Sequence, residues 1–256
     1  MLPGERRNNI LEMLQINRTI TVQNLCDTMA ASEATIRRDL AILETEGKLE
    51  RTHGGAILSS RMKLDFEDSF YQKVTQFPAQ KRAIAKKAFE MLNENDSIAL
   101  DSGTTTRELA RLIGQSKLHI TVITNSTMLS GEISNNPNVA LFVLGGKVRL
   151  NVMSSVGNIA IDTLRRFNVD KAFVAVNGLS AESGLTTPDI DEADIKRAML
   201  SSASERYVLA DHSKFNRVAM CQIAPISMVD TIITDNDLEA GMLAQFESSD
   251  IEIFRA

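Results

Sequence analysis

Aromatic residues are scarce in this chain. It has no tryptophan, two tyrosines and ten phenylalanines, which together make up 5% of its 256 residues. Proteins that bind single-stranded nucleic acids without sequence preference stack the bases on aromatic side chains, so this composition argues against that mode of binding. Hydrophobic residues nevertheless make up 43% of the chain and charged residues 24%, which is ordinary for a globular protein with a sizeable core.

Cysteine is scarcer still, and long apolar runs are missing. Cys26 and Cys221 lie far apart, and neither has the spacing of a metal site or of a Cys-x-x-Cys motif, so we predict buried, reduced thiols and no metal. No run approaches the roughly 18 apolar residues of a membrane-spanning helix, and the N-terminus lacks the apolar core of a signal peptide. We therefore expect a cytoplasmic protein with no membrane partner.

The chain also lacks an excess of positive charge. Its net charge is −5, and residues 1–61 carry eight Lys or Arg against eight Asp or Glu, whereas the remainder carries 20 against 25. If the N-terminal part binds nucleic acid, its affinity has to come from a few arginines gathered on one surface. The candidates are Arg37, Arg38, Arg51 and Arg61. Binding through such phosphate contacts should weaken steeply with salt.

The stretch from Ser32 to Ala56 is the most informative in the sequence. Ser32 is a favourable N-cap residue, and an acidic residue follows it where the helix dipole favours negative charge. Apolar residues then recur at helical spacing, at Ile36, Leu40 and Leu43. Gly47 is placed like a glycine that ends a helix, so the pattern predicts an amphipathic helix over residues 34–46.

The face of this helix opposite the apolar stripe carries Arg38, with Thr35 and Arg37 on its flanks. Arginine can contact a guanine edge or a phosphate, and small neighbouring side chains allow close approach, so the helix suits the major groove of DNA. Residues 48–58 predict a short hairpin with its turn at residues 52–55, which would form a wing beside the helix. An ordinary amphipathic surface helix followed by a hairpin is the alternative interpretation.

Two shorter helices are predicted ahead of this stretch, and a connection behind it. The first helix covers residues 5–15, and the buried side of the second contains Leu25, Cys26 and Met29. With the hairpin, these helices make a complete small domain over residues 1–60. Residues 61–78 are more polar and lack a clean period, so we predict a linker there and a second domain over residues 79–256.

Predicted strands and helices alternate in the second domain. The strands are short continuous apolar runs, at residues 97–100, 120–124, 139–144, 171–176, 207–210, 231–234 and 251–254. The helices are at residues 79–92, 105–113, 127–135, 159–167, 190–202 and 238–246. Continuous rather than alternating apolar strands predict a mostly parallel sheet covered by helices on both faces, and hence an α/β fold.

Polar residues follow these strands, at the edge of the sheet where α/β proteins bind ligands. After residue 100, a glycine and several hydroxyl side chains precede a helix, and the free N–H groups of a helix N-terminus bind anions. This loop is neither a Walker A loop nor a dinucleotide fingerprint, so we expect no nucleotide cofactor and predict none of another kind. The candidate binding residues at the strand ends are Asp101, Ser102, Gly103, Thr104, Thr105, Thr106, Asn125, Gly146, Lys147, Asn177, Glu192, Asp211 and Lys214.

Taken singly, each of these segments is an ordinary strand-ending turn or a solvated charged stretch. Taken together, hydroxyls, amides, acids and a lysine at successive strand ends suit a phosphorylated polyol. The phosphate group would then take the helix N-terminus and either Lys214 or Lys147, while Asn and Asp side chains bind the hydroxyl groups.

Both halves of the chain resemble the DeoR family of bacterial transcription regulators. In the first half the resemblance rests on S-E-A-T-I-R-R-D-L at residues 32–40, followed by the pattern E-x-x-G-K-L-x-R-x-H-G-G-A at residues 44–56. In the second half the family's motifs stand in order, as D-x-G-T-T, T-N-S, L-G-G, V-G, D-K-A-F-V, G-L-T and D-x-S-K-F.

The resemblance implies an N-terminal winged helix-turn-helix domain that binds double-stranded operator DNA. Its candidate contacts are Ser32, Thr35, Arg37, Arg38, Arg51 and His53. It also implies a sensor domain similar to ribose-5-phosphate isomerase and glucosamine-6-phosphate deaminase, with the strand-end residues as ligands of a phosphorylated sugar. His212 departs from the serine more usual in the family, which leaves the preferred sugar open. We expect a homo-oligomer, a dimer or tetramer, that represses a carbohydrate-utilisation operon until the sugar phosphate binds.

Two other functions are compatible with the sequence. The chain could be an active sugar-phosphate isomerase or deaminase with an appended DNA-binding domain, in which Glu192, Asp211 and His212 supply the base and the proton shuttle. His212 would be the only histidine there, because His53 lies in the wing and His119 enters a strand. The chain could also be a nucleoid-type DNA binder with a structural second domain. We favour the regulator without enzymatic activity.

Overall fold

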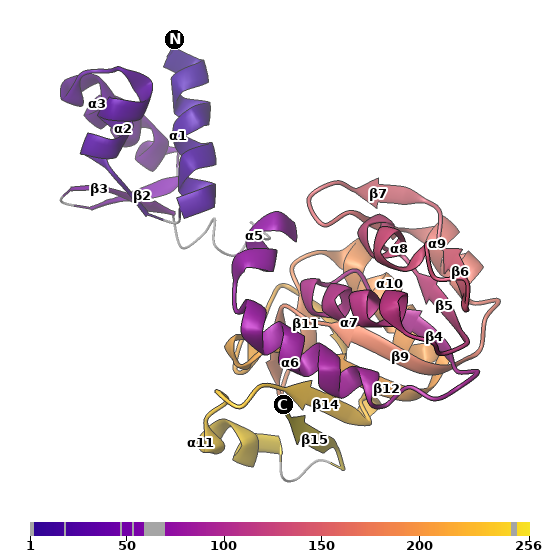
Figure 1. The fold of residues 1–256 in the computed structure, drawn as a ribbon. Coiled ribbons are helices and arrows are strands. Elements are labelled where there is room, and N and C mark those ends of the chain that lie inside the picture. Colours follow the sequence, from indigo (N-terminus) through magenta and orange to yellow (C-terminus); the bar gives the residue numbers. More distant parts are fainter. Residues whose placement is uncertain (1–2, 18, 47, 53, 59–69, 247–249) are drawn as a thin grey trace. The chain divides into compact units, whose positions relative to one another are not determined.

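The computed structural model describes residues 3–17, 19–46, 48–52, 54–58, 70–246 and 250–256. The chain divides into two compact units, Met1–Asp68 and Ser69–Ala256 (Figure 1). Gly47, His53 and Arg61, which carry sequence-based predictions, lie outside the described residues. Within the described ranges, no helix combines the length and the apolar character needed to cross a membrane.

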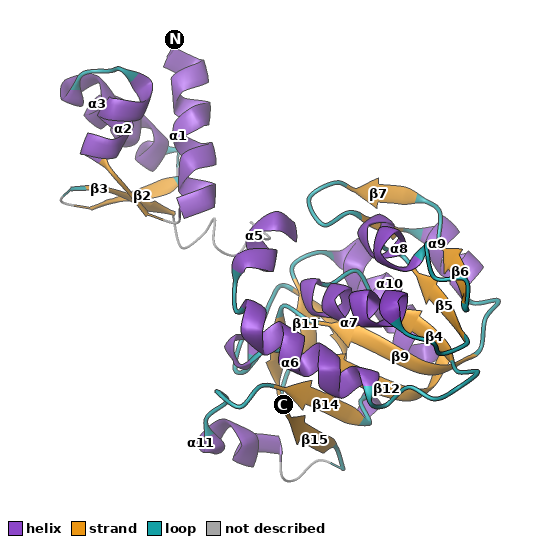
Figure 2. Cartoon of the chain, viewed as in Figure 1, coloured by secondary structure: helices purple, strands orange, loops and turns teal. Residues whose placement is uncertain are grey.

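The first unit consists of three helices and a three-stranded antiparallel sheet (Figure 2). Its elements are α1 (Pro3–Asn17), β1 (Thr19–Thr21), α2 (Val22–Met29), α3 (Glu33–Thr45), β2 (Leu49–Thr52) and β3 (Gly55–Leu58). Strand β3 lies between β1 and β2 and pairs with both. The predicted helices and the hairpin are confirmed. The pattern did not predict β1, because three residues are too few to show a period.

The apolar stripe of α3 faces the core of this unit. Ile36, Leu40 and Leu43 are each at most 1% exposed and pack with buried residues of α1, α2 and the sheet. The hydroxyl of Ser32 caps the helix, since it accepts a hydrogen bond from the backbone N–H of Thr35 at 3.3 Å. The cap and the buried stripe therefore form as the spacing predicts, and they turn the opposite face of α3 outward.

The second unit is built on a seven-stranded sheet in which neighbouring strands run parallel. Its strands are β4 (Ser97–Leu100), β5 (Ile120–Thr124), β6 (Val139–Val143), β9 (Val169–Ala175), β12 (Ala203–Leu209), β14 (Thr231–Thr234) and β15 (Glu252–Arg255). They stand in the order β15-β14-β12-β9-β4-β5-β6 across the sheet. All seven predicted strands are confirmed, and with them the α/β fold class.

Helices cover both faces of this sheet (Figure 1). The helices of this unit are α5 (Phe70–Thr75), α6 (Pro78–Phe89), α7 (Thr104–Gln115), α8 (Thr127–Ile133), α9 (Asn158–Leu164), α10 (Ile190–Ser201) and α11 (Ala240–Leu243), with 3-10 turns at His212–Lys214, Ile226–Met228 and Ala244–Phe246. Buried residues of α6, α7 and α8 form one apolar cluster with one face of the sheet. Those of α9 and α10 form a second cluster with the other face, which explains why the strands are apolar throughout.

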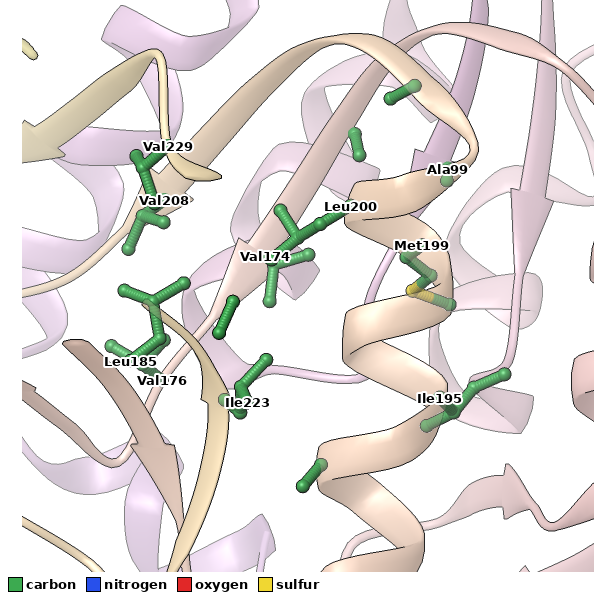
Figure 3. Packing of buried hydrophobic residues seen from close by; sticks show 14 of the residues in the cluster. Ala99, Val174, Val176, Leu185, Ile195, Met199, Leu200, Val208, Ile223 and Val229 are labelled. Atoms are coloured by element: carbon green, nitrogen blue, oxygen red, sulfur yellow. The ribbon is translucent and has the colours of Figure 1, made fainter. Parts of the chain in front are cut away.

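Helix α10 is fixed on the sheet by a close-packed apolar face. Ile195, Met199 and Leu200 are 0% exposed and share a cluster with Val174 of β9 and Val208 of β12 (Figure 3). Truncating one such side chain to alanine typically costs about 2–5 kcal/mol, so the position of α10 is strongly determined. This matters for function, because α10 also carries buried charged residues.

Five short strands of the second unit were not predicted. They are β7 (Lys147–Arg149), β8 (Ser154–Val156), β10 (Gly178–Ser180), β11 (Gly184–Thr187) and β13 (Cys221–Ala224). The first two pair as an antiparallel hairpin, and the other three form a small antiparallel sheet. Most of these short strands contain glycine, serine or charged residues and lack the continuous apolar run by which the strands of the large sheet were predicted.

Residues 70–78 belong to the second unit, although the polar composition of residues 61–78 predicts a linker. Phe70 is 1% exposed, and its backbone N–H donates to the carbonyl of Asn151 at 2.8 Å. The guanidinium of Arg107 lies over the Phe70 ring, 6.0 Å from its centroid. One apolar anchor thus draws α5 into the second unit. The functional assignment of the two units stays a prediction.

Candidate functional site

The order of strands reverses beside β4. From β4 the chain proceeds to β5 and β6 on one side, and it later returns to β9 on the other side, with β12, β14 and β15 beyond. In open α/β sheets such a reversal opens a crevice at the carboxyl ends of the two central strands. Residues that follow β4 and β9 therefore lie where this class of fold binds ligands.

Asp101, the first residue after β4, is fully buried at this reversal. Its Oδ2 atom accepts a hydrogen bond from the backbone N–H of Ala175, the last residue of β9, at 3.2 Å. Its carboxylate also accepts from Nζ of Lys196 on α10, and Lys196 donates to the carbonyl of Ala175 at 3.0 Å. These contacts join β4, β9 and α10 at one point.

The loop that follows Asp101 is held by Thr106. The hydroxyl of Thr106 donates to the carbonyl of Asp101 at 2.6 Å and accepts from the N–H of Gly103 at 2.7 Å, so it is used within the loop. Gly103 has no room for a side chain, since a Cβ atom would lie 2.4 Å from that of Ala175. Gly103, the N-cap residue of α7, has no side chain that could accept from the first turn, so the N–H groups of that turn, which begins with Thr104 and Thr105, suit an anion.

Buried polar atoms without a hydrogen-bond partner among the described residues gather at this edge of the sheet. They include Asp101 Oδ1, Ser102 Oγ, Asn125 Oδ1, Asp211 Oδ2 and Thr234 Oγ1. These residues end or closely follow β4, β5, β12 and β14. A buried polar atom left without a partner costs about 1–3 kcal/mol, so the edge is suited to a polar molecule from outside the chain.

A 3-10 turn after β12 places Lys214 beside Asp211. Nζ of Lys214 lies 3.8 Å from Asp211 Oδ2, and Asp211 Oδ1 accepts from the N–H of Ser213 at 3.1 Å. Lys81 of α6 adds a second cation near this carboxylate. Lys81 is 4% exposed, and burial lowers its pKa to about 8, while the charge of Asp211 raises this pKa and that of Lys214 lowers it.

His212, Asp235 and Asp237 lie close enough together to hold a cation. The carboxylate of Asp235 already accepts from the N–H groups of His212 and Asp237, at 2.8 and 3.0 Å, and lies 2.9 Å from Nδ1 of His212. Both oxygen atoms are engaged within the chain, which accounts for the burial of Asp235. The His212 ring also packs edge-on against the ring of Phe77, with 4.7 Å between the ring centroids.

Glu192 faces the β7–β8 hairpin. Its Oε1 atom lies 3.0 Å from Nη1 of Arg149 and accepts from the hydroxyl of Ser154 at 3.0 Å. Asn125 reaches the same hairpin, since its Nδ2 atom donates to the carbonyl of Ser155 at 3.3 Å. The structure thus connects two of the predicted ligands through the adjacent residues 154 and 155.

Three further predicted ligands have their own local contacts. Gly146 has a φ of 131°, a backbone conformation that favours glycine. Nζ of Lys147 lies 3.0 Å from Asp191, with 72% of the lysine side chain exposed. The side-chain oxygen of Asn177 accepts from the hydroxyl of Thr187 at 3.1 Å. A role for these residues in binding stays a prediction.

Sequence reasoning missed Lys196, Arg149 and Lys81. Lys196 follows Glu192 by four positions, which puts both on one face of α10, and this spacing was an available signal. Lys81 precedes Ile84 by three positions, so helical periodicity places it on the buried face of α6. Arg149 lies on a strand that is too short for its pattern to be recognised.

The arginines near the outward face of α3 differ in their surroundings. Arg38 is exposed, and its side chain has no ion pair or hydrogen bond to the described part of the chain. Arg37 lies 2.7 Å from Glu33, and Arg51 of β2 lies 2.7 Å from Glu44. Arg37 and Arg51 also line a hollow between α3 and the β2–β3 hairpin.

An ion pair on the inner side of α3 fixes the orientation of its outward face. Asp39 is 3% exposed, and its carboxylate lies 2.6 Å from Nε of Arg6, which ties α3 to α1. At the start of α3 the hydroxyls of Ser32 and Thr35 lie 2.8 Å apart. The helix is therefore held at its first turn and along its inner face, and Arg38 is presented on a rigid support.

Two parts of the chain match known protein families. Residues 6–62 match the DeoR-like helix-turn-helix domain, and residues 76–236 match the DeoR C terminal sensor domain. The two matches follow one another in the chain, and neither overlaps the other.

Similar proteins match over nearly their whole length. The HTH-type transcriptional regulator GlpR of Haloferax volcanii is 38% identical over 253 residues, which cover 99% of this chain and 98% of that protein. The lactose phosphotransferase system repressor of Lactococcus lactis is 37% identical over 243 residues, or 94% of each chain.

Among solved structures, a ribose 5-phosphate isomerase from Methanocaldococcus jannaschii is 20% identical, with a TM-score of 0.39 over 53% of each chain.

Proposed function

Because the chain belongs to the DeoR family of DNA-binding transcription regulators, we propose that it represses a carbohydrate-utilisation operon until a phosphorylated sugar binds. The winged helix of the first unit holds double-stranded operator DNA, and the strand-end site of the second unit holds the sugar phosphate. The Lactococcus lactis relative is named as a repressor of a lactose phosphotransferase system, which supports both the repression and the carbohydrate signal.

The proposed DNA contacts divide between bases and phosphates. Arg38 is exposed without a partner among the described residues, so we assign it to a guanine edge, where a bidentate contact discriminates by about 1–3 kcal/mol. Arg37 and Arg51 have exposed carboxylate partners, and such surface pairs contribute at most about 1 kcal/mol, so both arginines can exchange the carboxylate for a phosphate. The remaining proposed contacts are Ser32, Thr35 and His53.

The observation that carries the effector proposal is the group of buried, unpartnered oxygen atoms at the carboxyl edge of the sheet. Carboxylate and amide oxygens accept hydrogen bonds and sugar hydroxyls donate them, so Asp101 and Asn125 are assigned to hydroxyl groups. The phosphate group is assigned to the uncapped first turn of α7 and to Lys214, because helix N–H groups and an ammonium both favour an anion. Thr106 supports this loop from within.

The remaining assignments follow the same edge of the sheet. Glu192 and Asp211 are assigned to sugar hydroxyls, and Lys147 to the rim of the site. We further propose that the chain acts as a homo-oligomer, because helix-turn-helix proteins bind operators as dimers with two half-sites about one helical turn apart.

A thermal unfolding screen of the full chain against sugar phosphates tests the effector proposal. A ligand that binds the native state alone raises the free energy of unfolding by about 2.7 kcal/mol at a hundredfold excess over Kd. One sugar phosphate, or a few related ones, should raise the melting temperature of the wild-type protein and leave that of Asp101→Asn unchanged. If no sugar phosphate raises it, the second unit is a structural partner of a DNA-binding domain and the proposal is wrong.

The same screen separates the regulator from a sugar-phosphate isomerase or deaminase. Each sugar phosphate that binds is incubated with the protein, and the products are followed by NMR. The carboxylate of Glu192, a candidate base, is engaged by Arg149 and Ser154, so we expect binding without conversion. Turnover that is lost in Glu192→Gln would favour the enzyme instead.

A further inference from the structure

Lys81 is a buried cation whose hydrogen-bonding capacity is only partly used. It lies on α6, is 4% exposed, and donates to the carbonyl of Lys73 on α5. An ammonium group has three N–H donors, and within the described ranges no second acceptor contacts Lys81. Unused donors on a buried cation are costly, so the position suits a second partner that carries negative charge.

The charges around Lys81 belong largely to the proposed effector site. Asp211 and Lys214 act on it from the turn after β12, and Glu108 acts on it from α7. Lys73 acts on it from α5. Burial lowers the pKa of Lys81 to about 8, so it still carries its proton in most molecules at neutral pH. Lys81 thus stands between the site that receives the phosphate group and α5.

Helix α5 is the first described element of the second unit. It begins at Phe70, two residues after the boundary between the units at Asp68. The chain that arrives from the DNA-binding unit must therefore pass through α5 before it reaches the sheet. The contacts that hold α5 include the Phe70 anchor against Asn151 and Arg107, and the hydrogen bond from Lys81 to the Lys73 carbonyl.

We propose that Lys81 is an effector ligand that releases α5: it bonds to the Lys73 carbonyl when the site holds no anion, and to the phosphate group when the site is occupied. This inference rests on the proposed function, to which it adds a residue and a route between the units. A ligand shifts an equilibrium between two arrangements only through its differential affinity for them. Here the difference is the hydrogen bond between Lys81 and phosphate, which one arrangement makes and the other lacks.

Hydrogen–deuterium exchange of the full chain tests the inference. The readout is the exchange rate of peptides that cover residues 70–77, with and without inorganic phosphate, ribose 5-phosphate, glucose 6-phosphate and fructose 1-phosphate. Lys81→Met removes the ammonium and keeps an apolar stem of similar length. Lys86→Met is the matched control, because Lys86 lies on the same helix and is exposed. Lys81→Arg keeps a cation at this position, and it replaces Lys81→Met in the experiment if that variant does not fold.

A bound phosphate group should speed exchange at residues 70–77 about tenfold in the wild-type protein and in Lys86→Met. In Lys81→Met, exchange there should be fast from the start and insensitive to phosphate. Its affinity for these anions should fall about tenfold to a hundredfold, the range of one hydrogen bond to a charged group. Lys81→Arg should keep part of the response.

Two results would overturn the inference and leave the proposed function intact. One is unchanged exchange at residues 70–77 in wild-type protein that demonstrably binds a sugar phosphate. The other is a Lys81→Met variant whose α5 still responds to phosphate as the wild type does. If the wild-type protein binds none of the anions and no other sugar phosphate, the proposed function itself fails.

Discussion

Lys196 donates to the carboxylate of Asp101 across 95 positions of sequence, and neither side chain is more than 5% exposed. A buried pair of this kind adds little net stability, because both charges lose their water. Its effect is positional. The pair occupies one oxygen of Asp101 and leaves Oδ1 without a partner among the described residues, at the point where the strand order reverses. We therefore infer that the pair fixes the position of Asp101 in the proposed sugar-phosphate site.

Removing one member of this pair should be costly. Lys196→Met leaves the Asp101 carboxylate buried without its cation, and breaking a buried pair typically costs about 3–5 kcal/mol, which urea unfolding of the full chain would measure. The double variant Asp101→Asn/Lys196→Met removes both charges and should recover most of that loss, yet it should not bind the sugar phosphate. If Lys196→Met is as stable as the wild type, the pair does not fix the position of Asp101.

The fold was largely predictable because it depends on local patterns. The run Thr231–Thr234 is apolar at its centre and became a strand of the predicted parallel sheet, and the spacing of Ile36, Leu40 and Leu43 became the buried stripe of α3. Both patterns report burial directly. A strand covered on both faces is apolar along its length, and a helix packed on one face is apolar at every third or fourth position. The resemblance of the motifs then supplied the order of the domains.

The candidate site was predictable only in part. Asp101 directly follows β4 and Lys214 lies in the 3-10 turn after β12, so the rule for strand ends finds both. Lys196 and Lys81 lie inside helices, where the spacing indicates only that each is on a buried face. It does not show that Lys196 contacts Asp101, 95 positions away, or that Asp211 and Lys214 lie near Lys81. Thr106 was predicted as a ligand from its place in the hydroxyl-rich loop between β4 and α7. Its hydroxyl bonds to the backbone of that loop, and its role in binding stays a prediction.

Arg38→Ala should abolish sequence preference without harming the fold. Arg38 is exposed, so its loss should change the free energy of unfolding by less than about 0.5 kcal/mol. Affinity for a duplex selected by the wild-type protein from a random pool should fall by about 1–3 kcal/mol, and affinity for a scrambled duplex should fall far less. Fluorescence anisotropy measures both, with the exposed Arg82→Ala of α6 as the control. An unchanged preference would remove Arg38 from the base-reading residues.

Arg51→Ala should instead weaken binding to every duplex alike. As a phosphate contact, Arg51 should contribute about one unit to the slope of log affinity against log salt, so the slope should become shallower by that amount. Arg51 donates to Glu44 through its backbone N–H and its guanidinium, which lowers the pKa of that carboxyl. Glu44→Gln should therefore strengthen binding to both duplexes. A change in the preferred sequence of either variant would mean that the wing reads bases.

The affinity for phosphate should depend on pH through Lys81. Burial lowers the pKa of Lys81 from 10.5 to about 8, while Asp211 and Glu108 raise it and Lys214 and Lys73 lower it. Because only the charged lysine attracts the anion, phosphate affinity should fall as pH rises through about 8. Calorimetric titration with inorganic phosphate between about pH 7 and pH 9 should show this fall in the wild type and much less of it in Lys81→Met.

Lys81 should also make the free energy of unfolding depend on pH, and this free energy should rise with pH where the phosphate affinity falls. The unfolded chain keeps the Lys81 proton up to about pH 10.5, whereas the native chain releases it from about pH 8, so the free energy of unfolding gains a rising contribution between these values. As the pH falls through 8 that contribution is lost. Urea unfolding of wild type and Lys81→Met over this range checks the sign. Identical profiles in the two proteins would show that Lys81 does not titrate as described.

The central claim is that sugar phosphate and operator DNA oppose one another, although their proposed sites lie on different units of the chain. Thr105→Val deletes a hydroxyl at the start of α7, and Lys214→Ala deletes a nearby cation. Both variants should bind operator as the wild type does, and both should need far more sugar phosphate to release it. Exposed Lys86→Met is the control, and it should release operator at the wild-type concentration.

The most direct measurement is the reciprocal one. Coupling between two binding sites is typically about 1–3 kcal/mol, and linkage requires operator DNA to weaken sugar-phosphate binding by the same factor by which sugar phosphate weakens operator binding. Calorimetric titration of the full chain with the sugar phosphate, with and without saturating operator duplex, measures that factor. We predict a Kd about fivefold to 150-fold higher in the presence of operator. Equal Kd values in the two titrations would contradict the account.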